Sequence, residues 1–119
     1  MGLIFVDASA ENDGKHKDIS MLVDSGASYS LLTKSIWKEL DLQPQREMEF
    51  VLADGTRIKR NVSECFLKLP IVNSEGHTPV ILGEEGDDEN LLGAVTLEIF
   101  GLVLDPLSRN IKPMRAMLV

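Results

Sequence analysis

The feature of this sequence that most constrains its fold is a series of short apolar runs separated by turn-forming residues. Short runs that end at Asn, Asp, Gly or Ser are typical of strands, whereas helices need apolar residues at three- and four-residue spacing over a longer stretch. No repeat, linker or low-complexity tract divides the 119 residues. We therefore predict an all-β fold, mainly strands with two short helices, in a single domain that spans residues 1–119.

The predicted elements follow one another closely along the chain. We expect short helices at 33–40 and 94–100, and strands at 2–6, 19–23, 29–32, 48–52, 58–62, 65–71, 78–82, 103–105 and 111–114. Thr33 can cap the first helix, and Gly101 can end the second one in a left-handed conformation. Asp54 and Gly55 predict a two-residue hairpin turn.

The charge balance of the chain is acidic and argues against nucleic acid as a partner. The sequence has 12 lysines and arginines against 19 aspartates and glutamates, a formal net charge of −7, whereas phosphate binding needs clustered basic residues. Five carboxylates lie within 84–89, which leaves 14 of the 19 acidic residues against 12 basic ones elsewhere. We expect 84–89 to be a solvated, mobile loop rather than a calcium site, because its spacing is not that of an EF-hand loop.

The sequence shows neither a membrane segment nor a secretion signal. The longest apolar stretch, 91–104, is interrupted by Thr96 and Glu98 and is well short of the roughly 20 residues that cross a bilayer. Cys65 is the only cysteine, so no internal disulfide can form. We therefore expect a cytoplasmic protein with no membrane partner, in which Cys65 is a small core residue.

The most informative segment is 21–28, an apolar strand that leads into Asp24 and a turn of small residues. Gly26 and its small neighbours would allow backbone amides and a substrate to approach the carboxylate closely, so Asp24 could serve as a general base. The alternative is that Asp24 only accepts hydrogen bonds from its own loop, as aspartates in turns commonly do.

The order of motifs along nearly the whole chain resembles that of the retropepsin-like aspartic proteases, specifically their small single-lobe members in prokaryotes. The family's catalytic Asp-Thr/Ser-Gly-Ala, its flap tip and its second apolar-apolar-glycine signature are matched by Asp24-Ser25-Gly26-Ala27, Ala53-Asp54-Gly55 and Leu91-Leu92-Gly93. A predicted short helix and a strand follow the second signature, as in the family. The resemblance implies a closed β-barrel lobe of the acid protease fold.

This sequence departs from the family's pattern in two places. The segment 81–83, Ile-Leu-Gly, also fits the second signature, and we prefer 91–93 because a predicted helix follows it. The expected flap tip has one glycine, where the viral relatives have several.

The resemblance implies a mechanism that needs two aspartates, and this chain supplies one. In the family, two facing carboxyls share a proton and activate a water that attacks the peptide carbonyl. Asp54 and Asp105 lack the Asp-Thr/Ser-Gly context, so the partner would be Asp24 of a second chain, which implies a homodimer. Ser25 is then expected to hydrogen-bond across the dimer, and residues 26–27 to contact an extended peptide or protein substrate.

We predict no cofactor and no metal, because His16 and His77 lie far apart in the sequence with no second ligand at metal-binding spacing. The sequence is thus interpreted as an aspartic endopeptidase that acts as a homodimer. Two alternatives stay open: a catalytically silent retropepsin-like module that dimerises or binds peptides, and an unrelated small β-barrel with an acidic binding loop. The complete 24–27 motif favours the enzyme.

Overall fold

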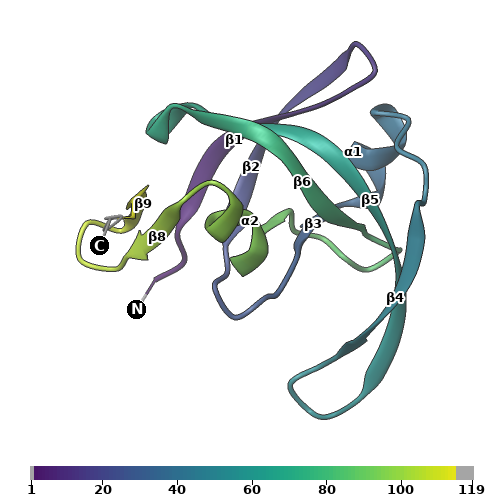
Figure 1. Ribbon diagram of the computed structural model, residues 1–119. Coiled ribbons are helices and arrows are strands. Elements are labelled where there is room, and N and C mark those ends of the chain that lie inside the picture. The colour runs from purple at the N-terminus through teal and green to yellow at the C-terminus, as the bar shows by residue number, and fades with distance from the viewer. Residues whose placement is uncertain (1, 115–119) are drawn as a thin grey trace, which may run out of the picture.

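The computed structural model describes residues 2–114, which consist mainly of strands (Figure 1). The strands are β1 (Phe5–Asn12), β2 (Lys15–Val23), β3 (Ser30–Leu32), β4 (Arg46–Val51), β5 (Arg57–Leu69), β6 (Ser74–Leu82), β7 (Leu91–Leu92), β8 (Leu102–Asp105) and β9 (Asn110–Pro113). The helices are α1 (Lys34–Glu39), α2 (Ala94–Ile99) and a 3-10 turn, η1 (Pro70–Val72). The predicted all-β class with two short α-helices is confirmed.

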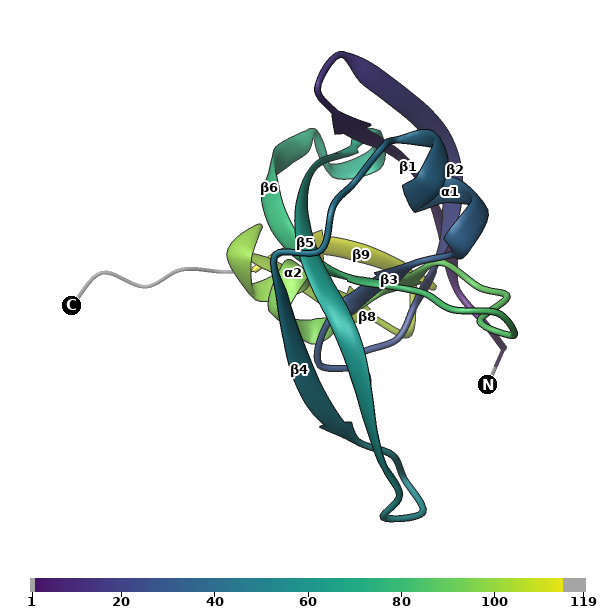
Figure 2. The same cartoon turned by 90° about the vertical axis from the view of Figure 1, so that its right-hand side faces the viewer.

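Six of the strands close into a barrel. They pair in the order β1-β2-β7-β3-β6-β5, and β1 pairs again with β5, with Ser9 opposite Lys68. Closure removes the free edges that an open sheet would expose. The fourth strand, β4, pairs only with β5, so the β4–β5 hairpin projects from the barrel, as Figure 2 shows. Strands β8 and β9 form a separate two-stranded sheet.

The hydrophobic core fills the barrel because alternate residues of its strands point inward. On β1, Val6, Ala8 and Ala10 are buried, while the residues between them are more exposed. Other buried core residues are Ile19, Met21, Val23, Leu32, Cys65, Leu67, Leu69, Val80, Leu82 and Leu92. Cys65 is a core residue, as predicted: it is 2% exposed, and burial raises the pKa of its thiol to about 12.

Several strands are longer than the sequence predicts. Only Asp13 and Gly14, with φ of 49° and 81°, connect β1 to β2, so most of the expected polar turn belongs to the strands. One face of a hairpin can be polar where it faces water, which is why polar residues did not end these strands. The strands predicted at 58–62 and 65–71 are one strand, β5, which ends where Pro70 begins η1.

The two α-helices begin and end close to their predicted positions. Thr33 occupies the N-cap of α1, but the side-chain capping bond expected of it is not formed. Gly101 follows α2 with φ of 66° and donates its N–H to Glu98 O at 3.0 Å, which is the predicted left-handed stop. Within residues 2–114, no helix has the length and hydrophobicity that crossing a bilayer requires.

Candidate active site

Asp24 lies directly after the end of β2, and backbone hydrogen bonds hold it on both sides. Its N–H donates to Leu92 O at 3.0 Å, and the N–H of Val23 donates to Ile4 O at 2.8 Å. The end of β2 is therefore held between the N-terminal segment and β7, which pairs with β2 in parallel. The position of the carboxylate is thus set by main-chain geometry rather than by flexible side chains.

The loop after Asp24 folds back onto its carboxylate. Gly26 N–H donates to Asp24 Oδ1 at 3.0 Å, and Ala27 N–H donates to Asp24 O at 3.1 Å. A Cβ on residue 26 would lie 3.3 Å from Oδ1, so glycine gives the carboxylate room. The loop hydrogen bond that the sequence left open as an alternative is therefore present, but it uses one oxygen only. Within residues 2–114, Oδ2 has no hydrogen-bond partner. Ser25 is exposed at the turn.

A chain of buried hydroxyls begins at Gly93, which follows β7. Gly93 N–H donates to Ser30 Oγ at 3.0 Å, Ser30 Oγ lies 2.6 Å from Thr96 Oγ1, and Thr96 Oγ1 lies 2.7 Å from Thr78 Oγ1. Thr78 donates to Pro79 O at 3.4 Å, so one direction satisfies every group: Ser30 donates to Thr96, and Thr96 donates to Thr78. The network ties β3, β6 and α2 to Gly93, the glycine of the second signature.

These hydroxyls could not be recognised as a network from the sequence alone. Ser30, Thr78 and Thr96 lie within segments predicted as strands or a helix, where serine and threonine carry little information by themselves. The available signal was a polar residue at an inward-facing position of each element, since a buried hydroxyl needs a partner.

The preferred second signature, rather than its duplicate, lies beside the strand that carries Asp24. Ala94, at the start of α2, donates its N–H to Ala27 O at 2.8 Å. A Cβ on Gly93 would lie 2.6 Å from the carbonyl carbon and oxygen of Tyr29, so the two backbones meet at a distance that only glycine allows. The duplicate at 81–83 pairs with β3 instead.

The β4–β5 hairpin forms one wall of a groove beside the Asp24 loop. The groove has a volume of about 360 Å³ and lies between loop residues 26–29 and hairpin residues 50–53. The rings of Tyr29 and Phe50 meet edge to face, with centroids 5.7 Å apart. Of the residues predicted for the flap, Ala53 lines the groove, while the rest of the tip extends beyond it. Asp24 itself is not part of the groove lining in a single copy of the chain.

The tip of the hairpin is a three-residue loop, so the predicted two-residue turn is wrong. Leu52 N–H donates to Thr56 O at 2.7 Å, which leaves residues 53–55 as the loop. Gly55 adopts φ of 86°, the left-handed position that a three-residue hairpin loop requires. Hydrogen bonds from the side chain and the backbone of Thr56 hold the pKa of Asp54 below its ordinary value.

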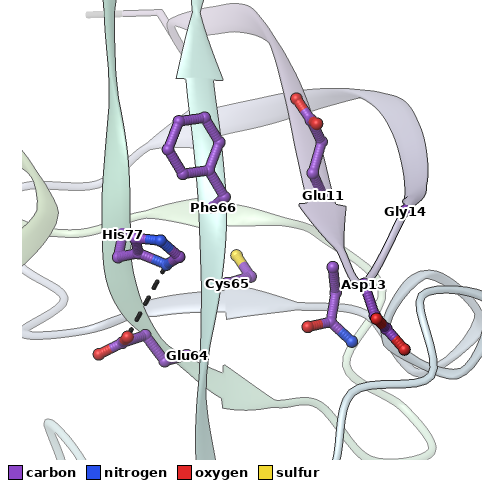
Figure 3. A pocket seen from close by; sticks show the side chains of 8 residues that line it. Glu11, Asp13, Gly14, Glu64, Cys65, Phe66 and His77 are labelled. Atoms are coloured by element: carbon purple, nitrogen blue, oxygen red, sulfur yellow. Dashed lines mark ion pairs between the residues drawn. The ribbon is translucent and has the colours of Figure 1, made fainter.

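A second hollow, between the β1–β2 turn and strands β5 and β6, contains side chains that could carry chemistry (Figure 3). His77 Nδ1 lies 3.8 Å from Glu64 Oε1, and both side chains are exposed. The thiol of Cys65 is buried. No group of three histidine, cysteine or acidic side chains converges as a metal site anywhere in residues 2–114. This hollow therefore offers no arrangement comparable to that at Asp24.

Comparison with known proteins agrees with this geometry. A family model described as "Aspartyl protease" matches residues 8–95, a range that includes the Asp24 loop, the flap hairpin and the second signature. The chain belongs to the aspartyl protease family. This member of the family is also similar to the solution structure of simian foamy virus (mac) protease, with a TM-score of 0.56 and 16% identity, over 82% of this chain and 92% of that chain. The likeness shows that it has the retropepsin-like fold. No curated protein matches it significantly.

Proposed function

We propose that this chain is an aspartic endopeptidase that hydrolyses peptide bonds as a homodimer, with a catalytic dyad made of Asp24 from each of two chains. The observation that carries the proposal is the environment of Asp24. A main-chain scaffold fixes the carboxylate, one of its oxygens has no partner within residues 2–114, and a groove with the β4–β5 hairpin as one wall begins at Gly26 of the same loop.

The paired aspartates would divide the work of an acid and a base. Two carboxylates a few ångströms apart cannot both ionise cheaply, so one keeps its proton. The ionised carboxylate takes a proton from water, whose oxygen attacks the peptide carbonyl carbon, while the protonated carboxyl donates to the carbonyl oxygen. The tetrahedral intermediate collapses as the C–N bond breaks, and the leaving amine takes up a proton from the dyad. No metal or cofactor is required.

The residues around Asp24 have supporting roles in this proposal. The hydroxyl of Ser25, which is exposed, would hydrogen-bond across the dimer, and the small residues Gly26 and Ala27 would allow a peptide backbone to lie close to the dyad. The hairpin tip at 53–55 would close over an extended peptide, whose alternate side chains enter the groove. The substrate class is therefore a peptide or protein in extended form.

Exposed apolar side chains on the N-terminal segment and on the β8–β9 turn support the proposed dimer. Leu3 is 66% exposed and lies next to Ile4, whose carbonyl accepts the hydrogen bond from Val23. Leu107, on the β8–β9 turn, is 95% exposed, and Arg109 of the same turn donates to Leu3 O at 3.0 Å. A second chain packed over this apolar face would cover it and would bring the two Asp24 loops close together.

The proposal is tested by peptide cleavage with an Asp24→Asn variant. Concentrated protein is incubated with an unbiased peptide library from acidic to neutral pH, with and without a statine-type transition-state mimic. The wild-type protein should cleave best under acidic to weakly acidic conditions, and the variant should lose at least about 10³-fold in rate, because the dyad acts as a unit. Asp13→Asn, in the β1–β2 turn, is the matched control and should cleave normally.

The outcomes separate the candidate functions. Full activity of Asp24→Asn with an unchanged fold would contradict the mechanism. A wild-type protein that binds peptides but cleaves none of them at any pH or concentration would instead indicate the catalytically silent module.

A further inference from the structure

The groove beside the Asp24 loop is mostly apolar. Among the described residues that line it, Arg60 and Asp87 alone carry a charge. Arg60 lies on β5, and Asp87 belongs to the segment between β6 and β7 that contains the five carboxylates of 84–89. One carboxylate of this acidic segment thus lies in the wall of the groove, while its neighbour Asp88 is exposed and does not line it.

The side chain of Asp87 is held in the groove wall through one of its two oxygens. Glu84 N–H donates to Asp87 Oδ2 at 2.8 Å, and Asp87 N–H donates back to Glu84 O at 3.0 Å. Arg60 Nε lies 3.7 Å from the same Oδ2. Within residues 2–114, Oδ1 has no polar partner, and 29% of the side chain is exposed. A fixed carboxylate therefore presents a free oxygen beside the groove.

The charge of Arg60 does not neutralise this carboxylate fully. Its Nη1 lies 2.9 Å from Glu84 Oε2, much closer than its Nε lies to Asp87. One guanidinium thus faces two carboxylates, Asp87 in the groove lining and Glu84 outside it, so the three side chains together carry one net negative charge. Apolar surroundings lower the local dielectric, so a cation brought to this point is attracted more strongly than it would be in water.

We propose that Asp87 is a specificity-determining residue. Through it, the groove selects peptides in which a lysine or arginine stands next to the apolar residue that enters the groove. The proposal rests on the proposed function, since the ligand is taken to be a peptide substrate. The long aliphatic part of a lysine or arginine can pack on the apolar lining while its charged end reaches Asp87 Oδ1. A glutamate at the same position meets a like charge that Arg60 neutralises only in part, and it is disfavoured.

Matched peptides test the proposal. The probe is an octapeptide mixture with a central Leu-Phe pair and randomised flanks, in which each flanking position in turn is fixed as Lys, norleucine or Glu. At one position, the wild-type protein should cleave the Lys form about fivefold faster than the norleucine form and the Glu form more slowly, and salt should weaken this preference. Because each ratio is internal to one protein sample, a partly folded variant cannot imitate the result.

Two variants test whether Asp87 is the residue that causes the preference for lysine. Asp87→Asn should reduce the Lys-to-norleucine ratio to about one, and Asp88→Asn, which removes the same charge outside the groove, should keep the wild-type ratio. Wild-type protein with no preference for Lys at any position, or equal ratios in both variants, would overturn the proposal.

Peptide binding to Asp24→Asn separates this inference from the proposed protease activity. This variant keeps the groove, so it should bind the Lys form about fivefold more tightly than the norleucine form in fluorescence anisotropy, and Asp24→Asn/Asp87→Asn should bind the two equally. Lys-selective binding by a wild-type protein that cleaves nothing would overturn the protease and leave the inference standing. Equal binding of both forms, or binding of neither, would overturn the inference even where cleavage is found.

Discussion

The Asp24 loop and the hairpin across the groove from it are built in opposite ways. The floor, which we define as loop 24–29 with Gly93 and the buried hydroxyls of Ser30, Thr78 and Thr96, is held by main-chain contacts and by hydrogen bonds that satisfy each of these hydroxyls. The wall, which we define as the β4–β5 hairpin with loop 83–90, is largely exposed and is held by ion pairs such as Arg57–Glu49 at 2.8 Å. The floor is suited to fixing a catalytic group, and the wall to moving and to choosing a ligand.

This difference predicts where substitutions act. Changes in the floor should lower the stability of the barrel and disturb the position of Asp24 together. Changes in the wall, such as those at residue 87, should alter which peptides are handled while the barrel stays folded.

The largest effect on stability is expected for Gly93→Ala in the floor. The new Cβ would lie 2.6 Å from backbone atoms of Tyr29, which cannot turn aside as a side chain can. We expect a loss of about 3 kcal/mol in the free energy of unfolding, measured by denaturant titration. Gly76→Ala is the matched control, because its Cβ would meet only the ring edge of Phe100, at 3.3 Å. Similar unfolding midpoints for the two variants would contradict a rigid floor.

A smaller effect is expected when the hydroxyl network is broken at its centre. Thr96→Val removes the partner of both Ser30 and Thr78 and leaves their hydroxyls buried. We expect a loss of about 2 kcal/mol by the same titration, since an unsatisfied buried polar group costs about 1–3 kcal/mol. The control is Thr33→Val, whose hydroxyl makes no capping bond, and it should shift stability much less. If Thr33→Val were as destabilising as Thr96→Val, the network would not be what stabilises the floor.

The smallest effect is expected for an exposed ion pair on the barrel itself. Lys68 Nζ lies 2.9 Å from Glu11 Oε2 across the β1–β5 seam, and the hydrogen bond and charge of Glu11 raise the pKa of Lys68 above its ordinary value of 10.5. The stability from this raised pKa is fully present below 10.5 and is lost as the pH rises through the folded-state pKa. Thermal melts are recorded at pH 8 and above pH 10.5. Between these two pH values the melting temperature should fall slightly more for the wild-type protein than for Lys68→Gln. An equal fall in melting temperature for both proteins would show that the Lys68–Glu11 pair contributes nothing to stability.

Much of the fold was predictable because its signals are local. The alternation of buried and exposed residues on β1, the left-handed glycine at 101 and the order of the Asp24 and Gly93 motifs can all be read from neighbouring residues. The errors have local causes too. Polar residues at 11–17 indicated a long turn, although only Asp13 and Gly14 form it and the others lie on strands. Asp54-Gly55 indicated a shorter loop than the one that forms.

The parts of the site that sequence reasoning missed depend on contacts between distant residues. Ser30 and Thr96 are 66 positions apart, so nothing in either segment shows that their hydroxyls meet. Nothing near Arg60 or Asp87 in the sequence shows that these two side chains meet either. The acidic segment 84–89 is mostly exposed, as predicted, but one of its carboxylates lies in the groove wall because β5 passes beside it.

The most direct test of the central claim, that Asp24 acts in pairs across two chains, is peptide cleavage by mixtures of wild-type and Asp24→Asn protein. The two are mixed, allowed to exchange chains, and assayed at a constant total concentration at which dimers form. If every active dimer needs both aspartates, the rate falls with the square of the wild-type fraction, so an equal mixture retains about a quarter of the wild-type rate. Retention of about half of that rate, as expected for chains that act independently, would contradict the account.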